Sequence, residues 1–165
     1  MLLFKGPRDQ LLSPLQAVCG IVEKRHTLPI LSNVLMEKNG EKLTLLATDI
    51  EIQITTQTPT QGAEKASMTV GARKMQDILR SLPESAEVSL TLDDKRLQLK
   101  AGKSRFNLQT LPAEDFPRMA TSDGQASRLS LTQKQMKRLL GLVQYAMAQQ
   151  DIRYYLNGLL LVAKG

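Results

Sequence analysis

The chain is of ordinary composition and moderately basic. Its 165 residues are 42% hydrophobic and 23% charged, with a formal net charge of +6, which is typical of a folded protein and excludes a disordered one. No apolar run approaches the ~18 residues of a membrane helix, and the first residues lack the pattern of a signal peptide. The single cysteine, Cys19, allows no internal disulfide, and one histidine with one cysteine argues against a transition-metal site. We therefore expect a soluble cytoplasmic protein that has no membrane association, metal or cofactor.

The positive charge is unevenly distributed. Residues 126–165 hold six Lys and Arg against one acid, Asp151, whereas residues 1–125 hold sixteen against fifteen. Five more of these cations lie between Lys95 and Arg105 with no acid among them. Basic clusters favour polyanions such as DNA. Surface strands and helices also carry Lys and Arg, so the charge by itself does not identify a partner.

The predicted elements recur in a fixed order along the chain, and the first repeat begins with a strand and a helix. Leu2 and Phe4 predict the strand. Residues 9–19 predict the helix, with Pro14 near its first turn and Gly20 at its end. Its apolar residues have the spacing of one helix face: Leu11, Leu15 and Val18. Three strands are expected to follow, at residues 30–37, 42–47 and 50–58.

The last of these strands shows the clearest alternation. One face would carry Ile50, Ile52 and Ile54. The other face would carry Glu51, Gln53 and Thr55. Asp49 and Glu51 are therefore expected on the polar strand face, as a solvated pair. Asn39-Gly40 is predicted to form the hairpin turn between the first two strands.

The same order of elements recurs in a second repeat. A strand over residues 66–70 precedes a helix over 72–82. Three further strands are predicted at residues 88–92, 97–99 and 106–108. Asp93-Asp94 and Gly102 lie at the two intervening turns. Each repeat thus contains one strand, one helix and three more strands.

A third repeat starts after the polar linker 121–125 and is incomplete. Leu129 and Leu131 predict its strand, and Thr132 with Gln135 forms a capping box at the start of its helix. The apolar spacing continues this helix to Met147. A last strand is expected over residues 156–163.

The repeats predict an α+β fold. Two of them can pair into one continuous curved antiparallel sheet with both helices on one face. The helices would then expose a polar set: Gln10, Ser13, Arg73, Gln76, Asp77 and Arg80. We expect residues 1–120 to form a complete first domain, 121–125 a linker, and 126–165 the incomplete start of a second domain of the same type.

Several segments match a known family in order and spacing. They are residues 27–31, 47–51, 72–74, 103–108, 111–117 and 147–158. The most specific are Arg-Phe followed by Leu-Pro-Ala-Glu-Asp-Phe-Pro, and Gln-Asp-Ile-Arg-Tyr-Tyr-Leu-Asn-Gly. Together they resemble the bacterial DNA sliding clamps, the beta subunits of DNA polymerase III, and the likeness runs along the whole chain.

The resemblance implies a DNA-clamp fold and a ring. In that family two chains of three domains close head to tail as a homodimer around duplex DNA, with helices lining the hole and sheets outside. Such a clamp is a processivity factor and not an enzyme: it tethers the replicative polymerase by topology, without reading sequence. Its partners are double-stranded DNA, the catalytic subunit of DNA polymerase III and the clamp loader. Because the remaining domains are absent from these 165 residues, we expect a truncated portion that cannot close a ring.

The resemblance also assigns residues to three surfaces. The expected DNA-binding residues are Arg25, Arg73, Arg80, Lys134, Lys137, Arg138, Gln150, Tyr154 and Tyr155. The expected dimer-interface residues are Lys74, Arg96, Lys103, Arg105, Phe106 and Leu108. Arg153 and Leu156 match part of the pocket that holds polymerase and clamp-loader peptides.

Two other functions remain open at this point. A nuclease could hold a divalent ion with acidic side chains, but these would have to converge in a cleft. The candidates are Asp49, Glu51, Asp93 and Asp94. A free-standing protein-interaction module would show neither salt-sensitive DNA affinity nor binding of polymerase peptides. His26 has no partner histidine or cysteine and is interpreted as a loop residue.

Overall fold

A computed structural model describes residues 1–22, 28–119 and 129–162 and divides the chain into two compact units, Met1–Ala120 and Thr121–Gly165. Where it is described, the first unit contains an eight-stranded antiparallel sheet and two α-helices. Its first half consists of β1 (Leu2–Pro7), α1 (Arg8–Cys19), β2 (Asn33–Asn39), β3 (Lys42–Thr48) and β4 (Gln53–Pro59). Its second half consists of β5 (Lys65–Gly71), α2 (Ala72–Ser81), β6 (Glu87–Asp93), β7 (Arg96–Ala101) and β8 (Ser104–Leu111). The predicted repeat of strand, helix and three strands is confirmed.

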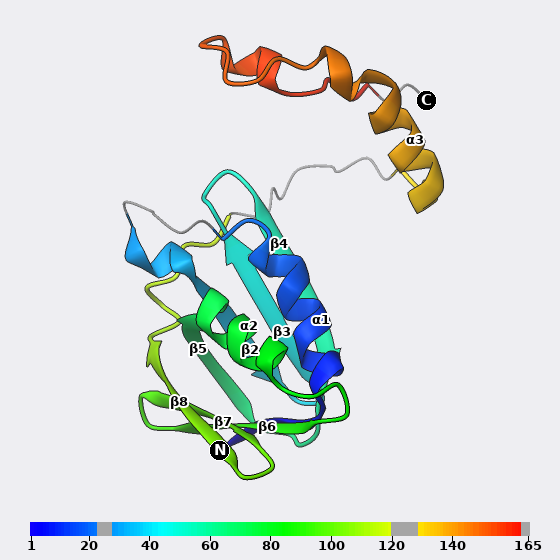
Figure 1. The fold of residues 1–165 in the computed structure, drawn as a ribbon. Coiled ribbons are helices and arrows are strands. Elements are labelled where there is room, and N and C mark those ends of the chain that lie inside the picture. Colours follow the sequence, from blue (N-terminus) through cyan, green and yellow to red (C-terminus); the bar gives the residue numbers. More distant parts are fainter. Residues whose placement is uncertain (23–27, 120–128, 163–165) are drawn as a thin grey trace. The chain divides into compact units, whose positions relative to one another are not determined.

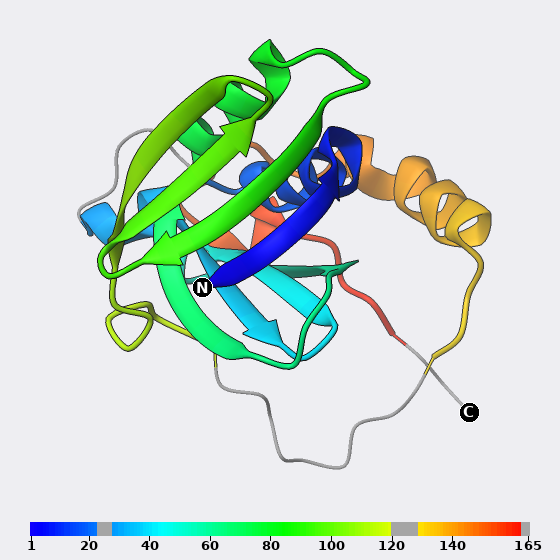
Figure 2. The ribbon, with the colours of Figure 1, turned by 90° about the horizontal axis from the view of Figure 1, so that it is seen from below.

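The two halves exchange their first strands. The strand order is β1-β6-β7-β8-β5-β2-β3-β4, so β1 pairs with the second half and β5 with the first. Both helices lie side by side on one face of the curved sheet (Figures 1 and 2). The main core fills the space between helices and sheet, with Leu11, Leu15, Met75 and Leu79 packed on buried strand residues. The predicted curved sheet with helices on one face is therefore confirmed.

Pro14 is the seventh residue of α1 and does not lie near its first turn as predicted. A proline there has no N–H to donate to the carbonyl four residues earlier. The Thr58 hydroxyl donates to that carbonyl instead, with Thr58 Oγ1 2.8 Å from Gln10 O. Thr56 Oγ1 donates in the same way to Pro14 O at 3.1 Å. The strand β4 thus supplies the donor that allows the helix to continue.

A second, smaller core lies on the other side of the sheet. Leu35 and Leu46 belong to neighbouring strands and are buried there under Ala113 and Phe116. Arg118 fixes the end of this covering segment through a bidentate ion pair with Glu37. The shorter of its two N–O distances is 2.7 Å. Residues 112–119 therefore cover apolar positions that an exposed sheet face would leave in water.

A buried lysine closes the seam between the two ends of the sheet. The Lys38 side chain is fully buried, and its Nζ donates to Leu2 O at 2.9 Å and to Gln61 O at 2.5 Å. Its third donor meets Glu64 Oε2 at 3.1 Å. Thr60 Oγ1 adds a bond of 2.7 Å to the next carbonyl of β1, that of Leu3. All three ammonium donors are used, which is how a buried charge is tolerated.

Two strand boundaries differ from the prediction. Residues Pro29–Ser32 form a 3₁₀ turn, so the strand expected from residue 30 begins at Asn33. The strand expected from Ile50 begins at Gln53, and Ile50 and Ile52 are exposed. Asn39 pairs with Lys42 across the first hairpin, which places the turn at Gly40 and Glu41, one residue later than predicted.

Local hydrogen bonds explain the second difference. Asp49 Oδ1 accepts from the backbone N–H groups of Glu51 and Ile52, at 3.0 and 2.7 Å. Thr48 Oγ1 accepts from Ile50 N and donates to Ile52 O. Ile50 is thereby held at φ +83°, a conformation that is rare for a β-branched residue. Asp49 and Glu51 consequently lie in a turn, and the prediction that they share a polar strand face is wrong.

The described part of the second unit, residues 129–162, contains one α-helix, α3 (Gln133–Val143), and two 3₁₀ turns, Gln144–Ala146 and Tyr154–Asn157. The predicted capping box is confirmed, because the Thr132 side chain accepts from Gln135 N and the Gln135 side chain accepts from Thr132 N. The helix ends before Met147, which it was predicted to reach. Residues 129–131 and 156–162 form no strand, so both strands predicted there are absent from the described part of this unit. None of the residues 129–162 is buried.

Within the described ranges, no helix is long and apolar enough to cross a membrane.

Candidate nucleic-acid and subunit interfaces

The exposed face of the helix layer carries both signs of charge. Arg73 and Arg80 are exposed on α2, as predicted, but Asp77 lies beside them and Asp9 is exposed on α1. Arg73 also donates through Nη2 to the carbonyl of Val22. The face of the first unit is therefore not strongly basic.

Two other predictions for this face have different outcomes. Gln76 is buried among the core residues of α2, so its assignment to the exposed polar set is wrong. Arg25 lies outside the described residues.

Cys19 ends α1 in a buried position, and burial raises the pKa of its thiol to about 11 against the opposing effect of Arg73 and Arg80. The thiol stays protonated at neutral pH and is poorly reactive.

The helix α3 presents a purely basic stripe. Lys134, Lys137 and Arg138 are spaced by three and four residues, which places them on one side of the helix. Four apolar residues of α3 lie on the opposite side, Met136, Leu139, Leu140 and Val143, whereas Leu142 lies beside the stripe. No carboxylate lies within 4.0 Å of the three cations in the described structure. This stripe can neutralise phosphates without reading bases.

The segment after α3 is a loop built around one aspartate. Asn157 Oδ1 accepts from Asp151 N at 2.9 Å, and Asn157 Nδ2 donates to Asp151 O at 3.0 Å. Arg153 binds the Asp151 carboxylate through Nε and Nη2, both at 3.1 Å. The Arg153 hydrogen bonds hold the pKa of Asp151 below its usual range, and Asp151 raises the pKa of Arg153.

This loop displays the remaining residues of the predicted DNA surface and pocket. Tyr154 and Tyr155 are 83% and 67% exposed, with their rings edge to face and their centroids 5.9 Å apart. They are available to a ligand and are not core residues within this unit. Gln150 is exposed at φ +58°. Leu156 is exposed at the pocket position, and Arg153 is occupied by Asp151.

The strand β8 offers an open edge beside a cluster of cations. It pairs with β7 along its length but with β5 only through Leu111 and Thr110. The edge of residues 104–109 that faces away from β7 therefore has no strand partner in the described structure. A bare edge of this kind can accept another strand.

The six predicted interface residues are distributed around this edge. Arg105 and Lys103 are exposed, and Phe106 is half-buried. Arg96 is exposed on the neighbouring strand and Lys74 in the first turn of α2. Leu108 is different, because it is 3% exposed and belongs to the core of its own unit. As an interface contact its side chain has almost no surface to offer.

The acidic residues considered for a nuclease do not meet. Asp49 and Glu51 lie in the turn between β3 and β4, whereas Asp93 and Asp94 lie at the turn between β6 and β7. No group of three or more His, Cys, Asp or Glu side chains able to hold a metal occurs within residues 1–22, 28–119 and 129–162.

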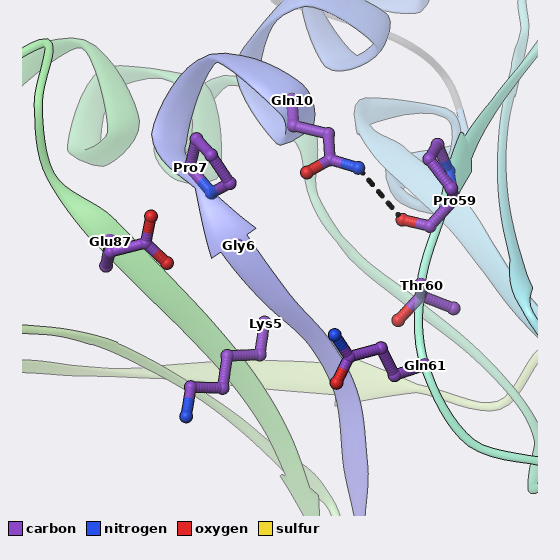
Figure 3. Close-up of a pocket in the computed structure, with 8 residues that line it drawn as sticks. All are labelled: Lys5, Gly6, Pro7, Gln10, Pro59, Thr60, Gln61 and Glu87. Atoms are coloured by element: carbon purple, nitrogen blue, oxygen red, sulfur yellow. Dashed lines mark hydrogen bonds between the residues drawn. The ribbon is translucent and has the colours of Figure 1, made fainter.

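A hollow of about 390 Å³ lies over the seam of the sheet (Figure 3). It is lined by Lys5, Gln10, Thr60 and Glu87 among others, and Gln10 Nε2 donates to Pro59 O at 3.4 Å. In Figure 3 the Lys5 ammonium and the Glu87 carboxylate extend in different directions. This arrangement of one cation, one anion and amides is not that of an acid–base catalytic pair.

Sequence reasoning did not find the free edge of β8. The available signal was that α2 begins at Ala72, directly after Val70 and Gly71. The strand β5 therefore ends before it can pair with the whole length of β8. That signal acquires meaning only once β5 and β8 are known to be neighbours.

Comparisons with known proteins agree along the chain. Residues 2–120 match the family model of the DNA polymerase III beta subunit, N-terminal domain. The chain is 45% identical over 163 residues to a beta sliding clamp of Pseudomonas aeruginosa and 44% identical over 164 residues to that of Escherichia coli, covering 98% of this chain and 44% of each relative. The chain thus spans less than half the length of these relatives.

Solved structures give the same result. The crystal structure of the DNA polymerase III subunit beta from Pseudomonas aeruginosa matches with a TM-score of 0.89 and 45% identity, covering 96% of this chain and 43% of that one. The pol III beta structure of Caulobacter crescentus matches with a TM-score of 0.88 and 42% identity, with coverage of 96% and 42%.

Proposed function

Because this chain belongs to the DNA polymerase III beta subunit family, we propose that its residues supply the first domain and the start of the second domain of a DNA sliding clamp. The observation that carries the proposal is the match to beta sliding clamps over 98% of the chain at 44–45% identity. In this function the protein catalyses no reaction. It surrounds duplex DNA and keeps the replicative polymerase on its template.

The proposed DNA contacts lie on α3 and on the loop that follows it. The basic stripe of Lys134, Lys137 and Arg138 supports weak neutralisation of phosphates, and the exposed Tyr154 and Tyr155 extend this surface. The first unit contributes less, because its two arginines lie beside acidic residues. Weak contacts to the backbone suit a protein that must slide, since tight base recognition would stop it.

The proposed ring-closing interface lies along the open edge of β8. A partner strand that pairs with residues 104–109 would gain main-chain hydrogen bonds and meet the cations Lys103 and Arg105. The partner surface is therefore expected to be acidic at its rim and apolar opposite Phe106. Leu108 supports this interface from within the core, and Arg153 with Leu156 forms part of the pocket for polymerase and clamp-loader peptides.

A chimera tests the clamp function directly. This chain replaces the 164 matching residues of the Escherichia coli beta sliding clamp, which supplies the remaining length. We expect the chimera to stay on nicked circular DNA after loading and to leave when the circle is cut, because only a ring is held by topology. Retention on linear DNA, or no retention on the circle by a folded chimera, would refute the proposal.

The 165-residue chain tests the assignment of the DNA surface. Duplex DNA should bind weakly, without sequence preference, and with an affinity that falls steeply as salt is raised. Charge reversal at Lys137 or Arg138 should weaken this binding about fivefold each. Charge reversal at Lys103, a matched cation on the β8 side, should leave it within twofold. An equal loss of DNA affinity from charge reversal at Lys103 and on α3 would show that α3 is not part of the DNA surface.

A further inference from the structure

The outer face of the second half of the sheet carries a row of cations, of which the proposed clamp function uses only Arg105, at the β8 end. Lys5 on β1 is directly opposite Ser89 on β6, Ser89 is opposite Lys100 on β7, and Lys100 is opposite Arg105 on β8. Directly opposed residues point to the same side of a sheet. The inward neighbours of this row, Val88 and Leu99 among them, belong to the main core. The row therefore faces away from the helices, on the four strands that lie in front of them in Figure 2.

The row is electrostatically unbalanced. None of its three cations has a carboxylate within 4.0 Å in the described structure, where the ion pairs involve other residues. Lys100 and Arg105 are like charges in directly opposed positions, an arrangement that destabilises a sheet. The row therefore adds repulsion between like charges and no ion pair to the folded state. A bound anion would reduce this repulsion.

A hollow of about 510 Å³ lies over the same row. Lys5, Ser89 and Lys100 line it together with the side chain of Leu2, and Glu87 stands in it as well. The two lysines are two strand spacings apart, roughly 10 Å at ~4.8 Å per strand. Carboxylates two positions apart on an extended peptide are ~6.6 Å apart, and the flexible side chains of the two lysines can close the remaining distance. An apolar residue of the same peptide can then meet Leu2.

We propose that this face, defined by Lys5, Ser89 and Lys100 and called here the outer basic row, binds an acidic polypeptide segment that carries an apolar residue. A polypeptide suits the face better than a nucleic acid for two reasons. Glu87 would repel a phosphate backbone, whereas the N–H groups of a peptide can bind its carboxylate. Single-stranded nucleic acids also rely on aromatic side chains for base stacking, and none lines the hollow.

The proposal is independent of ring closure. The lysines of the outer basic row belong to β1 and β7, whereas the open edge proposed for ring closure belongs to β8. Arg105, which lies opposite Lys100 and belongs to the proposed ring-closing surface, is left unchanged in the test.

The test measures fluorescence anisotropy of a labelled peptide, Asp-Ser-Asp-Leu-Asp-Ser-Asp, with the full chain at about 50 mM salt, where surface charges are weakly screened. Lys5→Glu and Lys100→Glu should each weaken binding about fivefold, as expected for one surface charge. Lys65→Glu is the matched control, because Lys65 is an exposed lysine on β5 outside the row. It should leave the affinity within twofold.

A stability measurement separates lost binding from lost folding. Lys100→Glu replaces a like-charge pair with an opposite pair facing Arg105 and should raise Tm by about 2 °C while it weakens peptide binding. A fall in Tm would mean that the opposed cations are not strained. The proposal is overturned by that fall, by no peptide binding, by an equal effect of Lys65→Glu, or by tighter binding of a single-stranded oligothymidine than of the peptide.

Discussion

The hydrogen bond between Thr58 and the carbonyl of Gln10 makes a specific prediction about stability. Thr58 is 3% exposed, and its hydroxyl replaces the N–H that Pro14 lacks. Thr58→Val keeps the shape of the side chain but leaves that carbonyl without its donor. A buried acceptor without a partner costs about 1–3 kcal/mol. We expect a loss near 1.5 kcal/mol, or a fall in Tm of about 6 °C for a unit of this size.

The physical reason can be isolated with a second substitution. In a Pro14→Ala background, the new N–H of residue 14 can donate to Gln10 O as in any helix. The cost of Thr58→Val should then shrink by about 1 kcal/mol. Thr56→Val is the matched control, because Thr56 donates to Pro14 O, a carbonyl that already receives the N–H of Val18 by helical geometry. Its smaller cost, about 0.5 kcal/mol, should not depend on Pro14.

Urea denaturation at 25 °C, followed by circular dichroism, gives the free energy of unfolding for each member of the cycle. Folded helix content must be equal in all four proteins. A cost of Thr58→Val that is the same with Pro14 as with alanine, within about 0.3 kcal/mol, would refute the idea that β4 supplies the missing donor.

Three further outcomes are expected. The backbone hydrogen bond of Glu64, and after it Lys38, hold the pKa of Glu64 below its usual value of 4.5. The stability that Glu64 contributes is therefore complete above that value and is lost as the pH falls through the lowered pKa. Glu64→Gln should unfold more easily than the parent at pH 7 and equally at pH 2, measured by urea titration. Ile50→Gly should raise stability by about 0.5–1 kcal/mol in the same titration, because glycine adopts the positive φ without strain, and a loss would show that the turn is unstrained. Phe116→Ala should cost about 3 kcal/mol and create new cleavage sites in residues 112–119 under limited proteolysis, whereas protection of that segment would show that Phe116 does not anchor it.

Local patterns were enough to predict most of the elements. The apolar spacing of α1, α2 and α3 and the capping box at Thr132 depend on neighbours within one helix turn, which the sequence contains in full. The failures lie where side chains bind nearby backbone or where partners are distant. The alternation of isoleucines extends to Ile50, but the bonds from Thr48 and Asp49 turn the chain there. Residues 156–162 have strand composition and no partner strand within the described part of their unit.

The candidate site was predicted by similarity more than by physics. Lys103 and Arg105 came from a matching segment, and the α3 cations came from their place on a helix that the family uses to line its hole. The structure shows all of them exposed. It also removes Leu108 from the surface. The residue pattern alone could not distinguish Leu108 from Phe106, because burial depends on which helices lie beneath the strand.

The sequence by itself determined the repeat, the helix faces and the alternation of each strand, because these follow from periods of 3.6 and two residues. Only the tertiary structure decided which strands became neighbours. That decision buries Leu35 under Phe116, gives Pro14 its substitute donor and leaves β8 with an open edge. An alternating pattern indicates that a residue faces one side of a sheet. It does not carry information about what covers that side, because the covering residues lie far away along the chain.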